Sequence, residues 1–188
     1  RYITQHEGKS GIIYCLSRKK VEELTELLVA NGIRALAYHA GMDAQTRAAN
    51  QDDFLMERAD VIVATIAFGM GIDKPDVRFV AHLDMPKSIE NYFQETGRAG
   101  RDGKPADAWM AYGLIDAVNQ RRLMEMGGGD EMYARLTRTK LEAMLALAET
   151  AGCRRQMILR YFGEESGPCG NCDNCLEPPK MQEVTEDA

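Results

Sequence analysis

The most chemically suggestive stretch of the chain is residues 94–103, QETGRAGRDG, where two arginines lie three residues apart and each stands beside a glycine. An arginine guanidinium is always charged and presents a planar fork of donors that suits phosphate oxygens. The glycines remove side-chain bulk, so the backbone can approach a ligand or another domain closely. The pattern therefore indicates phosphate binding by Arg98 and Arg101, although a glycine-rich surface turn with two solvated arginines would have the same sequence.

The cysteines form a second, independent pattern, because four of the five have the spacing of metal ligands. Cys169, Cys172 and Cys175 are separated by two residues each, and Cys153 lies 16 residues upstream. Four thiolates suit a tetrahedral structural zinc ion. Disulfide bonds are the alternative, although a reducing compartment keeps thiols free, and an iron–sulfur cluster also uses closely spaced cysteines. We predict zinc at these four residues and a small core residue at Cys15.

Residues 64–73, ATIAFGMGID, are a third candidate site. The hydroxyl of Thr65 and the glycine amides could hold a phosphate, and the carboxylate of Asp73 could accept hydrogen bonds from ribose hydroxyls. A glycine-softened loop that ends in a helix cap would have the same composition. The pattern Gly-x-x-x-x-Gly-Lys-Ser/Thr occurs nowhere in the 188 residues, so this sequence carries no phosphate-binding P-loop.

The elements that must position these groups follow from the apolar pattern of residues 1–113. Short β-prone runs alternate with amphipathic stretches of helical period, which predicts βαβ units, a parallel sheet and right-handed crossovers. Open parallel sheets bind ligands beyond the carboxyl ends of their strands, so we expect chemistry at residues 16–19, 39–41 and 65–73. We predict a doubly wound α/β domain with strands at 11–15, 35–38, 61–65, 78–83 and 106–112, and with helices capped by Ser17, Asp43 and Ser88.

A helical pair is expected between the α/β domain and the last three cysteines. The pair displays six basic residues against two acidic ones over residues 135–160, a local charge of +4. Such a face is either simply solvated or in contact with nucleic-acid phosphates. The first helix has an apolar stripe of Leu136, Leu141, Met144, Leu145 and Ala148, and the second one of Met157, Ile158, Tyr161 and Phe162.

Composition sets the outer limits of function. The apolar content of 45% and the charged content of 28% are typical of a globular protein. No apolar run approaches the ~18 residues of a membrane-spanning helix, and no signal-peptide pattern opens the sequence. The formal net charge of −6 argues against nucleic-acid binding over the whole surface, but a local basic face remains compatible with it.

Residues 11–20, 37–42, 61–84 and 88–103 together resemble the second RecA-like domain of a superfamily-two helicase. More narrowly, ATIAFGMGIDKPDVRFVAH followed by ENYFQETGRAGRDG resembles motifs V and VI of the RecQ DNA helicases. The stretches CRRQMILRYFGE and PCGNCDNC look like the zinc-binding subdomain of that family, with Cys153 at the start of the second helix. The resemblance covers nearly the whole chain.

This resemblance implies roles for individual residues. In the family, motif VI arginines reach across a cleft to the phosphates of ATP, held with Mg²⁺ by the first RecA-like domain. Catalytic roles are thereby implied for Arg98 and Arg101, with Arg101 expected at the γ-phosphate. Nucleotide contacts are implied for Gly71, Asp73 and Gln94, with Asp73 at the ribose. Contacts with the DNA backbone are expected at Ser17, Arg18, Thr65, Arg154, Arg155 and Arg160.

We expect a RecA-like domain over residues 1–118, a helical-hairpin zinc-binding subdomain over 119–178, and a linker or the start of a winged helix over 179–188. The implied function is the C-terminal part of the motor core of an ATP-dependent 3′→5′ DNA helicase for repair and recombination. Its partners would be single-stranded and junction DNA and the first RecA-like domain, in a bacterial-type cytoplasm at the nucleoid. Without that domain the chain should not hydrolyse ATP. A stand-alone zinc-stabilised binding module and half of an RNA helicase are the alternatives.

Overall fold

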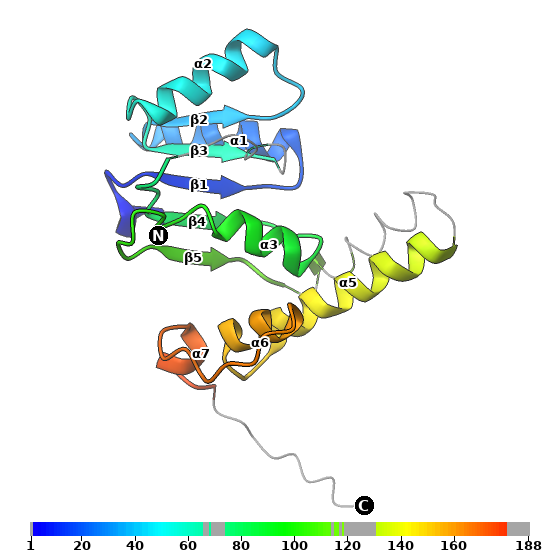
Figure 1. The fold of residues 1–188 in the computed structure, drawn as a ribbon. Helices are drawn as coiled ribbons and strands as arrows, with labels where there is room; N and C mark the ends of the chain where they lie inside the picture. The colour runs from blue at the N-terminus through cyan, green and yellow to red at the C-terminus, as the bar shows by residue number, and fades with distance from the viewer. Residues whose placement is uncertain are drawn as a thin grey trace, which may run out of the picture.

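The computed structural model describes residues 2–65, 68, 74–113, 115, 116, 118 and 131–179. Its centre is a five-stranded, all-parallel sheet with the strand order β2-β3-β1-β4-β5 (Figure 1). The predicted strands are confirmed: β2 has the predicted bounds, and the other four are slightly shorter than predicted. They are β1 (Gly11–Tyr14), β2 (Ala35–Tyr38), β3 (Val61–Ala64), β4 (Phe79–His82) and β5 (Asp107–Met110).

The three central strands are buried along their whole length, as expected for a parallel sheet covered on both faces. Their sequences GIIY, VIVA and FVAH are accordingly almost continuous apolar runs. The edge strand β5 is mostly exposed. The register aligns the last residues of four strands in one row at the carboxyl edge: Tyr38, Ala64, Tyr14 and His82.

Three helices cover the sheet, and each begins at the cap that the sequence predicts. The helices are α1 (Arg18–Ala30), α2 (Ala44–Leu55) and α3 (Ile89–Thr96), and a 3₁₀-helix η1 (Ile3–His6) precedes β1. Ser17, Asp43 and Ser88 each accept a hydrogen bond from the backbone amide three residues later, which satisfies a donor that the first helical turn leaves open.

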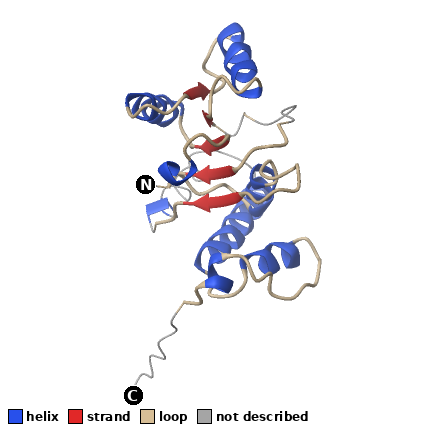
Figure 2. Ribbon diagram, turned by 90° about the vertical axis from the view of Figure 1, so that its left-hand side faces the viewer, coloured by secondary structure: helices blue, strands red, loops and turns tan. Residues whose placement is uncertain are grey.

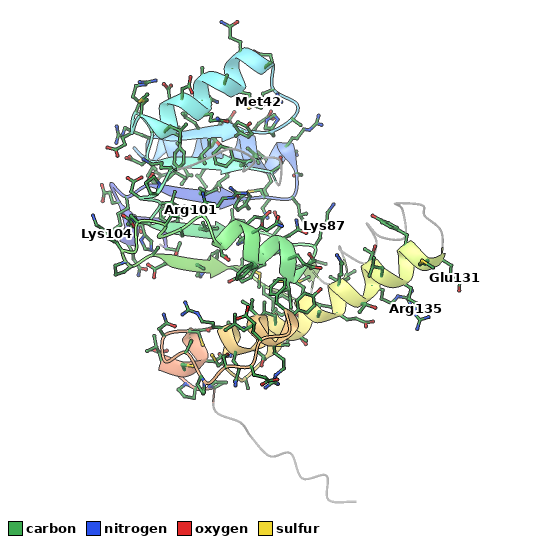
Figure 3. All side chains as sticks on the ribbon, viewed as in Figure 1. Met42, Lys87, Arg101, Lys104, Glu131 and Arg135 are labelled. Atoms are coloured by element: carbon green, nitrogen blue, oxygen red, sulfur yellow. The ribbon has the colours of Figure 1, made fainter. Side chains whose placement is uncertain are left out.

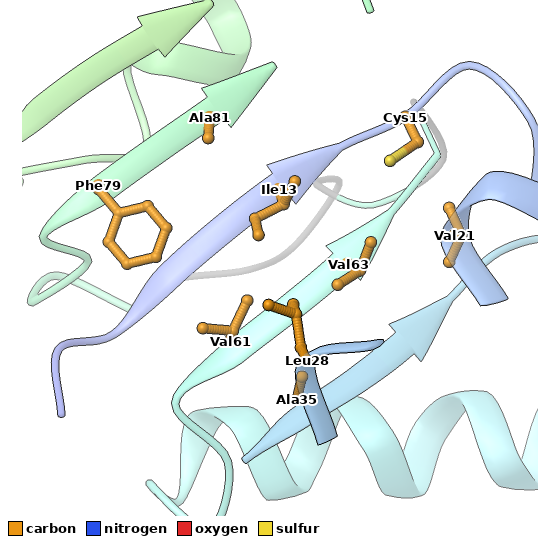
Figure 4. Packing of buried hydrophobic residues seen from close by; sticks show 9 residues of the cluster. All are labelled: Ile13, Cys15, Val21, Leu28, Ala35, Val61, Val63, Phe79 and Ala81. Atoms are coloured by element: carbon orange, nitrogen blue, oxygen red, sulfur yellow. The ribbon is translucent and has the colours of Figure 1, made fainter. Parts of the chain in front are cut away.

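The core lies in two layers, because alternate strand residues point to opposite faces. On one face, Val21 and Leu28 of α1 pack against Ile13, Val63 and Phe79 (Figure 4). Cys15 belongs to this layer and is 3% exposed, which confirms it as a core residue. On the other face, Phe54 of α2 and Ala99 just after α3 pack with Ile12, Tyr14 and Phe68. Helices on both faces confirm the doubly wound α/β fold.

The helical part consists of α5 (Glu131–Glu149), α6 (Arg154–Tyr161) and the short α7 (Asp173–Leu176). It lies beyond the β5 edge of the sheet (Figures 1 and 2). Its apolar contact is made with α3 and the residues before it. The cluster consists of Met85, Ile89, Leu141, Met144 and Leu147, all at most 3% exposed.

The predicted stripe of α5 is only partly right. Leu141 and Met144 are buried as expected, but Leu136 is 55% exposed, so its assignment to the apolar stripe is wrong. Leu147, which the prediction omits, is 2% exposed. The amino-terminal half of α5 extends past α3 (Figure 1), and Leu136 is not a member of the apolar cluster that α5 forms with α3. On the second helix, Tyr161 is 38% exposed.

In the part of the chain that the structure describes, no helix is both long enough and apolar enough to cross a membrane.

Candidate arginine site and metal centre

The arginine loop, residues 97–103, follows the last turn of α3 and is tied to the segment before β4. The Gly100 amide donates to the Val77 carbonyl at 2.9 Å, and the Asp102 amide donates to the Pro75 carbonyl at 3.1 Å. The Asp102 carboxylate also pairs with Arg78 at 2.6 Å. Gly100 has a φ of +69°, and a Cβ atom there would lie 3.0 Å from the Lys104 carbonyl oxygen, so the turn requires glycine.

The two candidate catalytic arginines have different surroundings. Arg98 is half-buried, and its guanidinium lies close enough to the hydroxyl of Tyr14, at the end of β1, to interact with it. Arg101 is exposed, and its Nε donates to the Gly97 carbonyl at 3.2 Å. Figure 3 shows Arg101 beside the sheet, between α3 and the turn that holds Lys104. The domain therefore orients Arg98 from its own core and presents Arg101 at its surface.

A buried polar pair lies beneath this loop, which sequence reasoning did not single out. Nε2 of His82, at the end of β4, is 2.7 Å from Oε2 of Glu95, in the last turn of α3. Their side chains are 1% and 7% exposed. The ring of Tyr14 stacks on His82, with centroids 5.3 Å apart. The signal available in the sequence was that Tyr14 and His82 each lie one residue before the predicted end of a strand.

The residues predicted to face DNA gather at the carboxyl edge of the sheet. Ser17 is the exposed N-cap of α1. The side chain of the next residue, Arg18, lies over Gly41: a Cβ atom added to Gly41 would be 3.0 Å from Arg18 Nη1. Thr65 is half-buried just after β3, and its amide donates to the Tyr38 carbonyl at 3.2 Å. The structure thus brings Ser17, Arg18 and Thr65 to the end of the sheet where we expected chemistry.

Asp84, which sequence analysis passed over, and His39, in the segment 39–41 where chemistry was expected, hold these loops. Asp84 accepts from the Leu16 amide at 2.9 Å and from Lys20 Nζ at 2.6 Å, which fixes the turn before α1. His39 is 4% exposed and accepts from the Gly41 amide through Nδ1 at 3.2 Å, while its Nε2 lies 3.1 Å from Glu22. Because Nδ1 is an acceptor there, the proton of neutral His39 must be on Nε2.

The remaining nucleotide-facing candidates can be placed only in part. Gln94 lies exposed on α3, four residues before Arg98. Gly71 and Asp73 lie outside the described residues, so the structure does not place them.

The four predicted metal ligands come together. Their Sγ atoms lie within 4.8 Å of one another, and the separations Cys169–Cys175 and Cys172–Cys153 are both 4.0 Å. Four sulfurs bonded to one zinc ion at about 2.3 Å would lie about 3.8 Å apart, whereas a disulfide would bring two of them to about 2.05 Å. The geometry therefore fits a single tetrahedral ion and not paired disulfides.

The environment of the thiols also fits a cation. Burial acts to raise the pKa of the Cys153 thiol, but hydrogen bonds from the backbone amides of Gln156 and Cys169 and from neighbouring thiols outweigh it and lower the pKa to about 6. The Gly170 amide acts to lower the pKa of Cys175, yet the neighbouring thiols raise it to about 11. Four thiolates this close repel one another, so full ionisation requires a positive ion among them.

The local fold explains how the ligands meet. Cys153 is the N-cap of α6, and the Cys169 amide donates to its Sγ at 3.2 Å. Arg154 braces the same region: its Nε donates to Asp173 of α7 at 2.7 Å, and its Nη1 donates to the Leu147 carbonyl of α5 at 2.7 Å. These contacts give Arg154 a structural role within the subdomain, and its predicted contact with DNA stays a prediction.

Fewer charges of the predicted basic face, residues 135–160, therefore face solvent than the sequence indicates. Lys140 lies 2.9 Å from Glu90 of α3 and so is also paired within the molecule. The four other basic residues of the face are exposed: Arg135, Arg138, Arg155 and Arg160. Of the three arginines predicted to touch DNA from this part, Arg155 and Arg160 are therefore the two whose side chains face solvent.

Known proteins match both parts of the chain. The family described as helicase conserved C-terminal domain matches residues 1–103, and the family described as RecQ zinc-binding matches residues 114–176. The ATP-dependent DNA helicase RecQ of Haemophilus influenzae is 50% identical over 190 residues, which are 100% of this chain and 30% of that protein. The RecQ-like DNA helicase blm-1 of Caenorhabditis elegans is 44% identical over 186 residues, 95% of this chain and 19% of that protein.

A solved structure is similar as well. The helicase Lhr of Mycobacterium smegmatis, bound to ssDNA and AMP-PNP, aligns with a TM-score of 0.54 and 27% identity over 68% of this chain and 18% of that one. The chain spans 30% of the length of the Haemophilus relative, so the comparison concerns one part of such proteins.

Proposed function

The chain belongs to the RecQ family of helicases, and from this membership we propose that it works as the C-terminal part of the motor core of an ATP-dependent DNA helicase with 3′→5′ polarity, in DNA repair and recombination. One observation carries the proposal: α3 links the two functional parts. Its carboxyl end continues into the arginine loop, and Ile89 at its amino end packs into the cluster with Met144 of α5.

In this role the arginines act in trans on a nucleotide held by a first RecA-like domain. ATP bound there with Mg²⁺ would supply the free energy of unwinding through its hydrolysis. Arg101 is exposed and so can reach another domain, where a guanidinium would stabilise charge that develops during phosphoryl transfer. Arg98 would make a second phosphate contact from a fixed orientation. Gly71, Asp73 and Gln94 would bind the nucleotide itself.

DNA would lie along the carboxyl edge of the sheet. Ser17, Arg18 and Thr65 gather there and offer hydroxyls, a helix amino terminus and a guanidinium, all of which suit phosphate oxygens. Arg155 and Arg160 would add contacts that do not depend on base sequence. The name of the Lhr structure, with ssDNA and AMP-PNP bound, supports both kinds of ligand. Action on DNA in a bacterial-type cell would place the protein in the cytoplasm, at the nucleoid.

Zinc would hold the helical part together. We propose a RecA-like domain over residues 1–118 and a zinc-binding subdomain over 119–178, followed by a linker or the start of a winged helix over 179–188. The subdomain has only a small apolar cluster, which it shares with α3. Metal binding would therefore contribute most of its folding free energy.

The test is ATP hydrolysis by a full-length enzyme that contains this chain. Arg101→Ala should lower DNA-stimulated kcat by about 10³-fold or more, since that is the worth of an arginine finger, while ATP and DNA binding persist. Lys104→Ala removes an exposed positive charge from the same turn and should leave kcat unchanged. Wild-type turnover in Arg101→Ala would reject the finger assignment and favour a zinc-stabilised binding module without motor activity.

A further inference from the structure

The carboxyl edge of the sheet carries a connected buried group that the proposed mechanism does not yet use. The register places Tyr14 of β1 directly beside His82 of β4. Their rings stack with centroids 5.3 Å apart and planes inclined by 20°. The residues are 3% and 1% exposed, so neither ring can turn without disturbing the core.

His82 is held from the opposite side by α3. Its Nε2 lies 2.7 Å from a carboxylate oxygen of Glu95. A carboxylate can only accept, so Nε2 carries a proton and the orientation of the ring is set. Glu95 is in the last turn of α3, three residues before Arg98. The buried pair therefore fixes the end of the helix from which the arginine loop starts.

The hydroxyl of Tyr14 has two partners. It donates to the Phe68 carbonyl at 3.0 Å, and the Arg98 guanidinium lies close enough to interact with it. A hydroxyl that donates its proton to Phe68 keeps lone pairs with which it can accept from a guanidinium. Phe68 belongs to residues 64–73, the stretch predicted to face the nucleotide and DNA. One buried oxygen thus joins that stretch to the arginine loop.

We propose that the Tyr14 hydroxyl, held in place by His82 and Glu95, is a positioning group that sets the orientation of Arg98 before the nucleotide arrives. The inference rests on the function proposed above. Tyr14 does not touch the substrate, and it acts only through the direction in which Arg98 points. A guanidinium already aimed at its phosphate loses less conformational freedom in the transition state than one that must be ordered.

The decisive variant is Tyr14→Phe in the full-length enzyme, because it removes one oxygen and keeps the ring on His82. We expect DNA-stimulated kcat to fall roughly 10- to 100-fold, the scale on which misplacing a catalytic group acts. KM for ATP should stay within about twofold, since the lost orientation matters mainly in the transition state. A kcat equal to that of the wild type would overturn the proposal.

Tyr38→Phe is the matched control. Tyr38 ends β2 in the same row of the sheet, and its ring also packs against Phe68, with centroids 4.6 Å apart. Its hydroxyl, however, faces Gln51 at 3.5 Å and not the arginine loop. Both variants should show similar melting temperatures, but only Tyr14→Phe should lose turnover. Equal losses in the two variants would mean that the hydroxyls serve the fold alone.

A double mutant separates positioning from general stability. If Tyr14 acts through Arg98, adding Tyr14→Phe to Arg98→Ala should lower kcat no further, and multiplying losses would overturn the inference. Failure of the underlying function looks different: Arg98→Ala and Arg101→Ala would then both turn over at the wild-type rate. A large loss in Arg98→Ala with none in Tyr14→Phe would reject this inference alone.

Discussion

Nζ of Lys140 on α5 lies 2.9 Å from Oε1 of Glu90 in the first turn of α3. This ion pair joins the zinc-bearing helices to the helix that leads into the arginine loop. The apolar cluster of Met85, Ile89 and Met144 lies in the same contact. The position of the helical part relative to the sheet is therefore supported by this charged pair, and by the Tyr112–Glu149 hydrogen bond, as well as by apolar packing.

The pair predicts an acid-sensitive contact. Burial acts to raise the pKa of Glu90, but Lys140, with contributions from Ser88 and Tyr161, outweighs it and lowers the pKa from 4.5 to about 2. A carboxyl with a lower pKa in the folded state stabilises that state above pH 4.5, and the contribution disappears as the pH falls toward 2. About a third of the Glu90 side chain is exposed to water. We therefore expect the pair to contribute about 1–2 kcal/mol to the free energy of unfolding, and not the ~3 kcal/mol that corresponds to the full pKa shift.

Glu90→Gln should therefore lower the free energy of unfolding at pH 7, and its difference from the wild type should shrink steadily as the pH falls toward 2. Urea unfolding of the chain across this range measures it. Glu142→Gln, at an exposed position on α5, is the control and should show no such pH-dependent difference. A Glu90→Gln difference that stays constant with pH would show that the pair does not contribute as described.

Arg155 and Arg160 are expected to contact DNA phosphates. Neutralising either one should weaken binding to all sequences alike and reduce the slope of log affinity against log salt by about 0.7 to 0.9, the effect of one phosphate contact. Fluorescence anisotropy over a range of salt concentrations gives the slope. Arg58→Ala, which removes an arginine paired with Asp53, should not change it. A slope equal to the wild type in Arg155→Ala and Arg160→Ala would mean that both side chains are merely solvated.

Arg154 should behave differently from its neighbour Arg155. Its guanidinium spans α5, α6 and α7 through Leu147 and Asp173. Removing it leaves the part-buried Leu147 carbonyl without its charged donor and the exposed Asp173 without its ion-pair partner, which should cost about 1–3 kcal/mol. We therefore expect Arg154→Ala to lower the unfolding midpoint of the helical part while the salt slope of DNA binding stays unchanged. A lower salt slope of DNA binding together with wild-type stability would instead mean that Arg154 contacts DNA phosphates.

Zinc removal should unfold the helical part and spare the α/β domain. Replacing Cys153, Cys169, Cys172 or Cys175 by serine leaves three thiolates, so each variant should lose about one zinc ion per chain. Limited proteolysis should then cut the chain beyond about residue 118. The α/β domain, residues 1–118, should remain as a resistant fragment, because the sheet has its own core.

Cys15→Ala is the internal control for metal content. Cys15 is 3% exposed in the layer beneath α1, in a different core cluster from the apolar contact of the helical part. Elemental analysis of the five variants decides the assignment. Full zinc retention in any of the four ligand variants, or iron in place of zinc in the wild type, would contradict it.

Much of the architecture could be predicted from local pattern. Ser17, Asp43 and Ser88 cap helices as expected, and the central strands fall where the apolar runs lie. The stripe on α5 shows where such reasoning stops. Leu136 and Leu141 have equal apolar character, but only Leu141 meets a partner on α3. Helical periodicity defines a face, whereas burial depends on how far the neighbouring element extends.

By itself, the sequence determined the elements, the arginine loop and the four thiol ligands, because caps, periodicity and cysteine spacing act over a few residues. Only the tertiary structure decided which charges are already engaged. Arg154 and Lys140 looked like members of one basic face, but each has an acidic partner within the molecule. Arg98 and Arg101 looked alike, yet only Arg98 meets Tyr14. These partners lie far apart along the chain and meet only where α3 lies on the sheet, where α5 packs on α3 and where α7 meets α6, which no local pattern encodes.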